Sequence, residues 1–149
     1  MPTTVLAPVA GTVVGLAAVP DPVFAQAIVG PGTAIDPELA PGTAVAPVDG
    51  TIAKLHPHAF VVVTADGKGV LVHLGIDTVN LGGEGFETLA AEGDAVKVGD
   101  PLVRWNPADV EARGLSPVCP VVALDADAAA LSGIAPGTVA SGAKLFVWD

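Results

Sequence analysis

Short apolar runs, separated by turns rich in glycine and proline, follow one another along the whole chain. Runs of three to seven residues rich in Val, Leu, Ile and Phe are typical of β-strands. They predict strands at residues 5–7, 12–14, 51–53, 60–64, 70–74, 102–105, 118–124 and 145–148. Asp66-Gly67 between two of these runs predicts a tight hairpin. The pattern therefore predicts many short strands joined by turns.

Helical signals are few and short. Residues 108–113 follow Asn106-Pro107 and precede Gly114, which supplies an N-cap, a proline in the first turn and a glycine after the end. Residues 84–91 and 125–131 predict two further helices of about two turns each. None is long enough to organise the fold.

Two patterns in the chain occur twice. Ala-Pro-Val-Ala-Gly-Thr-Val at residues 7–13 returns as Ala-Pro-Val-Asp-Gly-Thr-Ile at residues 46–52. The spacing Val96-x-x-Gly99-x-x-Leu102 returns as Val139-x-x-Gly142-x-x-Leu145. With no crossover helices, these echoes predict an all-β fold, an antiparallel β-sandwich with internal pseudo-symmetry and a few short helices. The length of 149 residues suits one domain, residues 1–149.

Composition narrows the class of protein. The 16 acidic residues outnumber the 6 Lys and Arg, so the net charge is −10, which argues against nucleic-acid binding. A hydrophobic content of 51% excludes a disordered chain. The single cysteine, Cys119, lies in an apolar segment and is expected to be a core residue without a disulfide.

A membrane span is not expected. Residues 1–20 carry no side-chain charge, but prolines and glycines interrupt them before any run approaches the roughly 20 residues that cross a bilayer. A secretory signal would also need a basic start, and the first lysine is Lys54. We therefore expect a cytoplasmic protein with no stable membrane insertion.

The candidate chemistry lies in the histidines. His73 falls in a strongly apolar predicted strand, where an imidazole needs a hydrogen-bond partner or a functional reason. His58 lies near the open end of the same hairpin, so strand pairing can bring the two rings face to face. Paired imidazoles suit metal binding. They equally suit phosphoryl transfer, one ring as nucleophile and the other as a hydrogen-bond donor to phosphoryl oxygens. A purely structural role stays open as well. Residues 19–30 are apolar and either join the core or form an exposed rim.

Several motifs together resemble the glucose-family enzyme IIA component of the bacterial phosphoenolpyruvate-dependent sugar phosphotransferase system. They are residues 7–11, 19–25, 28–30, 45–52, 58–60 and 92–100, and above all Val72-His73-Leu74-Gly75-Ile76-Asp77-Thr78-Val79 with the Gly83-Glu84-Gly85-Phe86 that follows. The resemblance covers nearly the whole chain.

This resemblance implies an antiparallel β-sandwich whose site is a shallow apolar depression. It implies that His73 is phosphorylated at Nε2 while a main-chain carbonyl holds its Nδ1–H, and that His58 supports the phosphoryl group. The group would arrive from the carrier protein HPr and leave to a cysteine of a IIB domain during sugar uptake. No cofactor is obligatory.

The resemblance also implies a docking face beside the histidines. Its residues are Asp21, Val23, Phe24, Ile28, Val29, Leu71, Asp77 and Val79. Some positions depart from the family. His56 stands near where a threonine usually supports the first histidine, Asn80 replaces a frequent acid, and the loop at residues 36–44 looks longer than in some members.

Two other classes of protein share part of this pattern. His56-x-His58 and His73-x-x-x-Asp77 look like the zinc ligands of lysostaphin-type metallopeptidases, but in reversed order. A biotinyl or lipoyl carrier needs a modifiable lysine at a hairpin tip, and no lysine has that setting. Regulatory binding of other transporters or kinases is compatible with the resemblance. There, a Zn²⁺ would be shared by His58, His73 and a carboxylate of the partner.

Overall fold

The computed structural model of the chain describes residues 2–149. Fourteen strands are present in that part: β1 Thr3–Leu6, β2 Gly11–Val13, β3 Gly32–Pro37, β4 Gly42–Val45, β5 Gly50–His56, β6 Ala59–Val63, β7 Gly69–His73, β8 Phe86–Thr88, β9 Ala95–Val96, β10 Pro101–Trp105, β11 Cys119–Ala123, β12 Leu131–Ser132, β13 Thr138–Val139 and β14 Lys144–Trp148. The helical elements among the same residues are α1 Pro22–Ala25 and α2 Pro107–Ala112, with 3-10 turns η1 Leu16–Ala18, η2 Thr78–Leu81 and η3 Ala128–Ala130.

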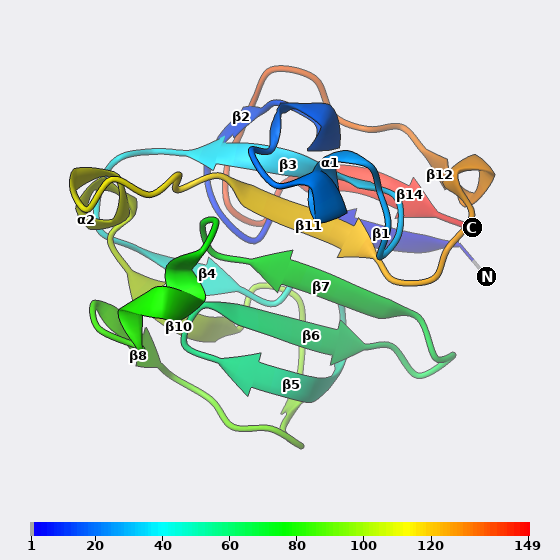
Figure 1. Cartoon of the computed structure of the whole chain (residues 1–149). Coiled ribbons are helices and arrows are strands. Elements are labelled where there is room, and N and C mark those ends of the chain that lie inside the picture. Colours follow the sequence, from blue (N-terminus) through cyan, green and yellow to red (C-terminus); the bar gives the residue numbers. More distant parts are fainter. Residues whose placement is uncertain (1) are drawn as a thin grey trace.

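The strands form two layers. One layer is an eight-stranded sheet in the order β13-β2-β3-β11-β7-β6-β5-β9, which faces the viewer in Figure 1. Behind it lie two three-stranded sheets, β1-β14-β12 and β4-β10-β8. The strand pairs are antiparallel, and Thr3 pairs with Trp148, so the first and last strands lie side by side. The all-β antiparallel sandwich predicted from the sequence is confirmed.

Successive side chains along the strands of the large sheet point to opposite faces, so two separate apolar clusters form, one on each face. In β7, Val70 and Val72 are fully buried and belong to the main core between the layers. Leu71 and His73 point to the opposite, outer face. A second cluster, built around Phe24 of α1, covers the outer face of β3 and β11. The short helix α1 lies in front of these strands in Figure 1.

The repeated sequence patterns correspond to a repeated set of hydrogen bonds. Leu6 N–H donates to Pro47 O (2.9 Å), and Val45 N–H, at the equivalent place before the second copy, donates to Pro8 O (3.0 Å). In the same way Gly142 N–H donates to Ala7 O (2.8 Å) and Gly99 N–H donates to Ala46 O (3.0 Å). The two halves therefore exchange equivalent contacts across their shared boundary, which is the predicted pseudo-symmetry.

Most predicted elements are present, with a few corrections. Each predicted strand overlaps an observed one, the 66–67 hairpin joins β6 to β7, and α2 occupies the predicted helix. The helix predicted at residues 84–91 is wrong, since Gly82, Gly83 and Gly85 adopt positive φ and β8 follows. The helix predicted at residues 125–131 is only the turn η3.

The strands that sequence reasoning missed are β3 and β4, which contain glycine or proline, and the two- or three-residue strands β8, β9, β12 and β13. Residues 36–44, expected as a loop, hold the end of β3 and the start of β4 around a short turn. Proline ends β3 at residue 37, where the strand also ends its pairing with β2. Among residues 2–149, no helix is long and apolar enough to cross a membrane.

Candidate functional site: a row of imidazoles on the outer face of the large sheet

Strand register brings the histidines together. His56 at the end of β5 lies opposite Ala59 of β6, and Ala59 lies opposite His73 of β7. Side chains on one such row project from the same face of a sheet. With strands spaced by roughly 4.8 Å, the two outer histidines start about 10 Å apart, with only the methyl group of Ala59 between them.

His58 fills the space between the outer histidines. It belongs to the two-residue turn Pro57-His58 that connects β5 to β6, and its carbonyl accepts a hydrogen bond from Leu74 N–H (2.7 Å). Its ring centroid lies 5.2 Å from that of His73, at an interplanar angle of 63°. The ring of His56 stacks on it at 5.6 Å and 17°. The predicted pair is therefore adjacent, and a third imidazole extends it.

The backbone after β7 fixes the tautomer of His73. The ring Nδ1 is hydrogen-bonded to the carbonyl of Gly75, two residues along the chain. A carbonyl only accepts, so Nδ1 carries the proton and a neutral ring presents an unprotonated Nε2. Gly75 has φ +84°, and a Cβ there would lie 2.7 Å from Thr78 Cγ2 and 3.0 Å from Ser116 O. Only glycine fits this turn without displacement.

The environment keeps both rings neutral at neutral pH. Burial is the main cause that lowers the pKa of His73, opposed by the Gly75 hydrogen bond and by the negative charges of Asp21 and Asp77. Burial also lowers the pKa of His58, helped by repulsion from the other two imidazoles. A neutral imidazole is the form that acts as a nucleophile.

The predicted acids lie close enough to His73 to act on its charge. Asp21 is the N-cap of α1, where its Oδ1 accepts a hydrogen bond from Val23 N–H (2.9 Å). Asp77 precedes η2 in a left-handed conformation, φ 61°, and is exposed. Two carboxylates beside the imidazoles give this site a negative surround.

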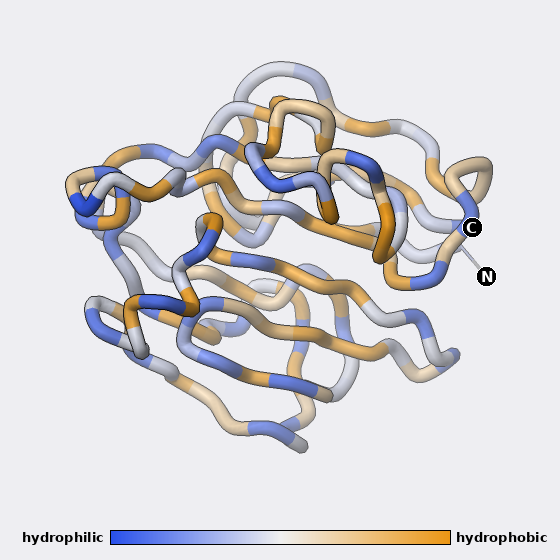
Figure 2. Tube along the Cα trace, viewed as in Figure 1, coloured by the Kyte–Doolittle hydropathy of each residue, from blue (hydrophilic) through white to orange (hydrophobic). Residues whose placement is uncertain are grey.

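The predicted docking residues divide into exposed and supporting ones. Ile28 is 65% exposed, Val79 57% and Val23 41%, so these three present apolar surface to solvent. Phe24 is only 9% exposed, and its ring centroid lies 5.4 Å from that of His73, so it forms the floor of the site. Val29 and Leu71 are half-buried against the same cluster. Figure 2 shows the apolar segments of α1 and of the chain after it on this face of the molecule.

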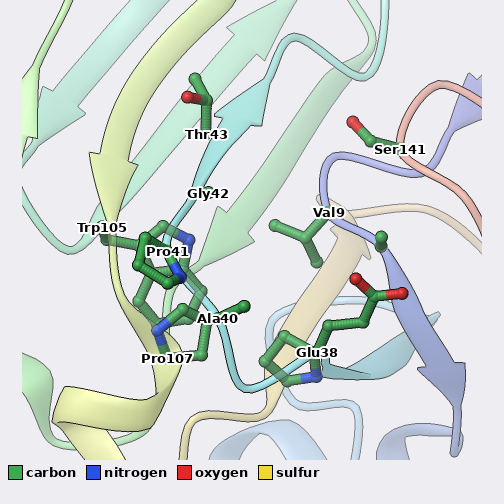
Figure 3. Close-up of a pocket in the computed structure, with 11 residues that line it drawn as sticks. Val9, Glu38, Ala40, Pro41, Gly42, Thr43, Trp105, Pro107 and Ser141 are labelled. Atoms are coloured by element: carbon green, nitrogen blue, oxygen red, sulfur yellow. The ribbon is translucent and has the colours of Figure 1, made fainter.

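Among residues 2–149, two of the hollows on the surface bear on the question of where the site lies. The one in Figure 3, with a volume of about 150 Å³, lies where the turn before β4 approaches Trp105 and α2, and none of the predicted site residues lines it. The other, of about 260 Å³, adjoins the imidazoles. It is lined by Lys54, His56, Ala59, Phe60, Val61 and Leu71. Of the three histidines, His56 lines this hollow, and His58 and His73 do not.

The arrangement offers no complete metal site. Within residues 2–149, no three His, Cys, Asp or Glu side chains are placed to hold a metal ion. His58 and His73 supply two nitrogens, whereas structural zinc usually takes four ligands and catalytic zinc three from the protein. The metallopeptidase alternative has no support. Cys119 is fully buried and burial raises the pKa of its thiol, as expected for a core residue.

Comparison with known proteins defines the class. Residues 3–129 match the family of the phosphoenolpyruvate-dependent sugar phosphotransferase system, EIIA 1. The glucose-specific EIIA component of Oceanobacillus iheyensis is 41% identical over 126 residues, 83% of this chain and 75% of that protein. That of Bacillus cereus is 41% identical over 128 residues, 85% of this chain and 76% of that protein.

A solved structure agrees with these relatives. Glucose permease IIA from Mycoplasma capricolum superposes with a TM-score of 0.91 at 33% identity, over 99% of this chain and 96% of that one. A β-sandwich of this kind, with this sequence, defines a phosphotransferase component. The chain belongs to the EIIA 1 family of the sugar phosphotransferase system and is a phosphocarrier of sugar uptake.

Proposed function

We propose that His73 Nε2 receives the phosphoryl group and that His58 supports it there. The observation that carries the proposal is the hydrogen bond from His73 Nδ1–H to the Gly75 carbonyl. It leaves Nε2 with its lone pair free, in a ring that burial keeps neutral. The adjacent His58 ring supplies an N–H for the phosphoryl oxygens.

The chemistry is two successive transfers. In the first, a nitrogen–phosphorus bond of phosphorylated HPr breaks as the bond between phosphorus and His73 Nε2 forms. In the second, that bond breaks as a sulfur–phosphorus bond forms on a cysteine of a IIB domain. No phosphate is released, and catalysis consists of alignment and charge stabilisation.

The donor and acceptor follow from the family. We propose HPr as donor and the IIB domain of a sugar permease as acceptor, with glucose as the first sugar to test, because the relatives are glucose-specific by name. We propose that residues 1–149 act as one domain, in the cytoplasm, where phosphoenolpyruvate is made. The net charge of −10 favours basic partners.

The exposed apolar residues beside His73 are proposed as the docking face. In-line transfer between two proteins requires a contact that excludes water, and Val23, Ile28 and Val79 offer the apolar surface for it. Ile28→Asp should lower kcat/KM for phosphoryl uptake from HPr by about tenfold, mostly through KM. Ile134→Asp is the control, since Ile134 is 46% exposed but lies between β12 and β13. Equal effects of the two changes would remove the docking assignment.

The central test is labelling with phosphoenolpyruvate, enzyme I and HPr. The wild type should take up one acid-labile, alkali-stable phosphoryl group, and His73→Ala none. His58→Gln should still accept the group from HPr and pass it to a IIB domain more slowly. Stoichiometric labelling of His73→Ala would overturn the proposal, and wild-type onward transfer from His58→Gln would remove His58 from it.

A further inference from the structure

The third imidazole, His56, has no role in the transfers proposed above. It is exposed at the end of β5 and stacks nearly parallel on His58, with ring centroids 5.6 Å apart and an interplanar angle of 17°. Ala59 lies across from it and is too small to reach either ring. His56 therefore covers His58 from the side away from His73, at the far end of the same row.

The orientation of the His58 ring depends on packing. Among residues 2–149, no backbone or side-chain group donates to or accepts from that ring by a hydrogen bond, in contrast to His73, which is tied to Gly75. Its backbone is held, because its carbonyl bonds to Leu74 N–H and Gly83 packs against the preceding Pro57. The rings of His73 and His56 lie against it at centroid distances of 5.2 and 5.6 Å, so both limit its rotation about the side-chain bonds. The stack with His56 is the contact that closes the outer side.

The charges around this row come from several elements. Lys54 lies on the same strand and face as His56, and Glu92 reaches β5 through a hydrogen bond from Leu55 N–H. Asp21 and Asp77 act on His73 from the other side. Repulsion from His56 contributes to the lowered pKa of His58. His56 therefore affects the charge state of the His58 ring as well as packing against it.

We propose that His56 is a positioning residue: its ring holds the His58 ring in the orientation that serves a phosphoryl group on His73. The proposal rests on the function proposed above. Stacked aromatic rings favour offset, parallel contact, and the effect here is orientation of a donor whose aim sets the transfer rate. A flat ring at position 56 should satisfy the requirement with or without its nitrogens.

The test compares two substitutions in the full chain. His56→Phe keeps the stacked ring, and His56→Ala removes it. Both should accept one phosphoryl group from HPr. Onward transfer to a IIB domain should fall about tenfold in His56→Ala and stay within about twofold of wild type in His56→Phe. The ring signals of His58 in NMR spectra should move strongly in His56→Ala, and its measured pKa should rise in both variants, since repulsion is lost.

A further variant distinguishes the loss of the stacked ring from a change in the electric charge near His58. Lys54→Ala removes a cation from the same strand and face and should leave the contact between the His58 and His73 rings, seen by nuclear Overhauser effects, unchanged. Wild-type onward transfer in His56→Ala would overturn the proposal. So would an equal loss in His56→Phe and His56→Ala. Labelling of His73→Ala would instead overturn the underlying function, whatever the His56 variants do.

Discussion

At the scale of single residues, Gly75 carries the chemistry of His73 through its backbone. Gly75→Ala should lower the free energy of unfolding by about 2 kcal/mol, since a left-handed alanine costs about 1 kcal/mol and its Cβ would lie 2.7 Å from Thr78 Cγ2. Displacement of the carbonyl would also remove the hydrogen bond to His73 Nδ1. Uptake of phosphoryl groups from HPr should therefore slow, in addition to the loss of stability seen by denaturant unfolding.

Gly99 provides the matched control for Gly75. Its φ is +85°, and an added Cβ would meet nothing within 4 Å. Gly99→Ala should cost about 1 kcal/mol of stability with no change in phosphoryl uptake. If both variants lose the same stability and transfer at the same rate, the Gly75 turn does not hold the His73 tautomer.

Ala59 sets the space that the His58 ring occupies. Ala59→Val adds two methyl groups between His56 and His73 on the row, while valine is well suited to a strand. The His58 ring should be displaced, and onward transfer to a IIB domain should fall about tenfold with little change in stability. Ala53→Val, at an exposed position of β5, is the control. Wild-type transfer by Ala59→Val would show that His58 does not need this space.

The sequence predicted the residues with unusual chemistry and missed those that act by being small. His73 stands out because an imidazole is rare in an apolar strand, and His58 because it lies near the open end of the same hairpin. Ala59 and Gly75 do not, because their effect depends on register and on a turn that brings Thr78 and Ser116 close. The stack of His56 on His58 is equally invisible before the two-residue turn between β5 and β6 is known.

At the scale of elements, helix α1 supports the site, and its C-terminal turn places an alanine in a left-handed backbone conformation. Ile28 N–H donates to Val23 O and Ala27 N–H to Phe24 O, the pair of bonds that ends many helices with a left-handed glycine. Here that position is Ala27, with φ 53°. Ala27→Gly should raise the free energy of unfolding by about 0.5 kcal/mol, because glycine relieves the strain and offsets part of it by its greater chain entropy.

The check on this prediction is a second alanine of the same segment. Ala25 lies within α1, so Ala25→Gly should lower stability by up to about 1 kcal/mol. Thermal unfolding of both variants distinguishes strain at position 27 from a general effect of glycine. A loss of stability in Ala27→Gly would mean that the left-handed turn carries no strain.

Two of the segments that sequence reasoning misjudged, residues 82–85 and 36–44, share one physical cause. Around residues 82–85 and 36–44, glycine and proline weaken local preference, and strand pairing decides the outcome. Phe86 stacks on Trp105 (5.8 Å, 14°) and pairs with it across β8 and β10, a contact between residues far apart in sequence. Local patterns predict α2 because its N-cap, proline and following glycine are all neighbours in the chain.

At the scale of the whole molecule, the two halves of the sandwich have equivalent strand pairing, and the site lies where their sequences differ. Pairing of β2 with β3 corresponds to that of β5 with β6, so β11 in one half is the counterpart of β7 in the other. By this register the counterpart of His73 is Val122, which is fully buried in the cluster that includes Phe24 of α1. The long segment with α1 covers one half only, and His73 lies at its edge. The repeated sequence patterns predict the equivalent strand pairing of the two halves. They do not predict that the segment with α1 covers one half only.

The burial of two imidazoles links the site to the stability of the whole chain. Burial is the first cause that lowers the pKa of both His58 and His73, so the fold binds fewer protons than the unfolded chain, where imidazoles titrate near pH 6.5. The contribution of the two imidazoles to the free energy of unfolding is therefore fully present above the pKa of the unfolded chain. It is lost as the pH falls towards the lower pKa of the folded state. Carboxylates, with ordinary pKa values near 4, stay charged through most of that window.

The free energy of unfolding should therefore decrease between about pH 7 and pH 5. The double variant His58→Gln/His73→Gln should lose most of this slope, because the two lowered pKa values that produce it are removed. Denaturant titrations at intervals of half a pH unit measure both curves, and His56→Gln is the control for an exposed imidazole.

Protonation of carboxylates reduces the repulsion among the negative charges of a chain with net charge −10, which acts in the opposite direction. A wild-type free energy of unfolding that rises as pH falls would therefore show that burial of the pair contributes less than surface charge. The same slope in wild type and double variant would show that the pair is not the source of the pH dependence. In either case, the neutral His73 required for attack on phosphorylated HPr would need another explanation.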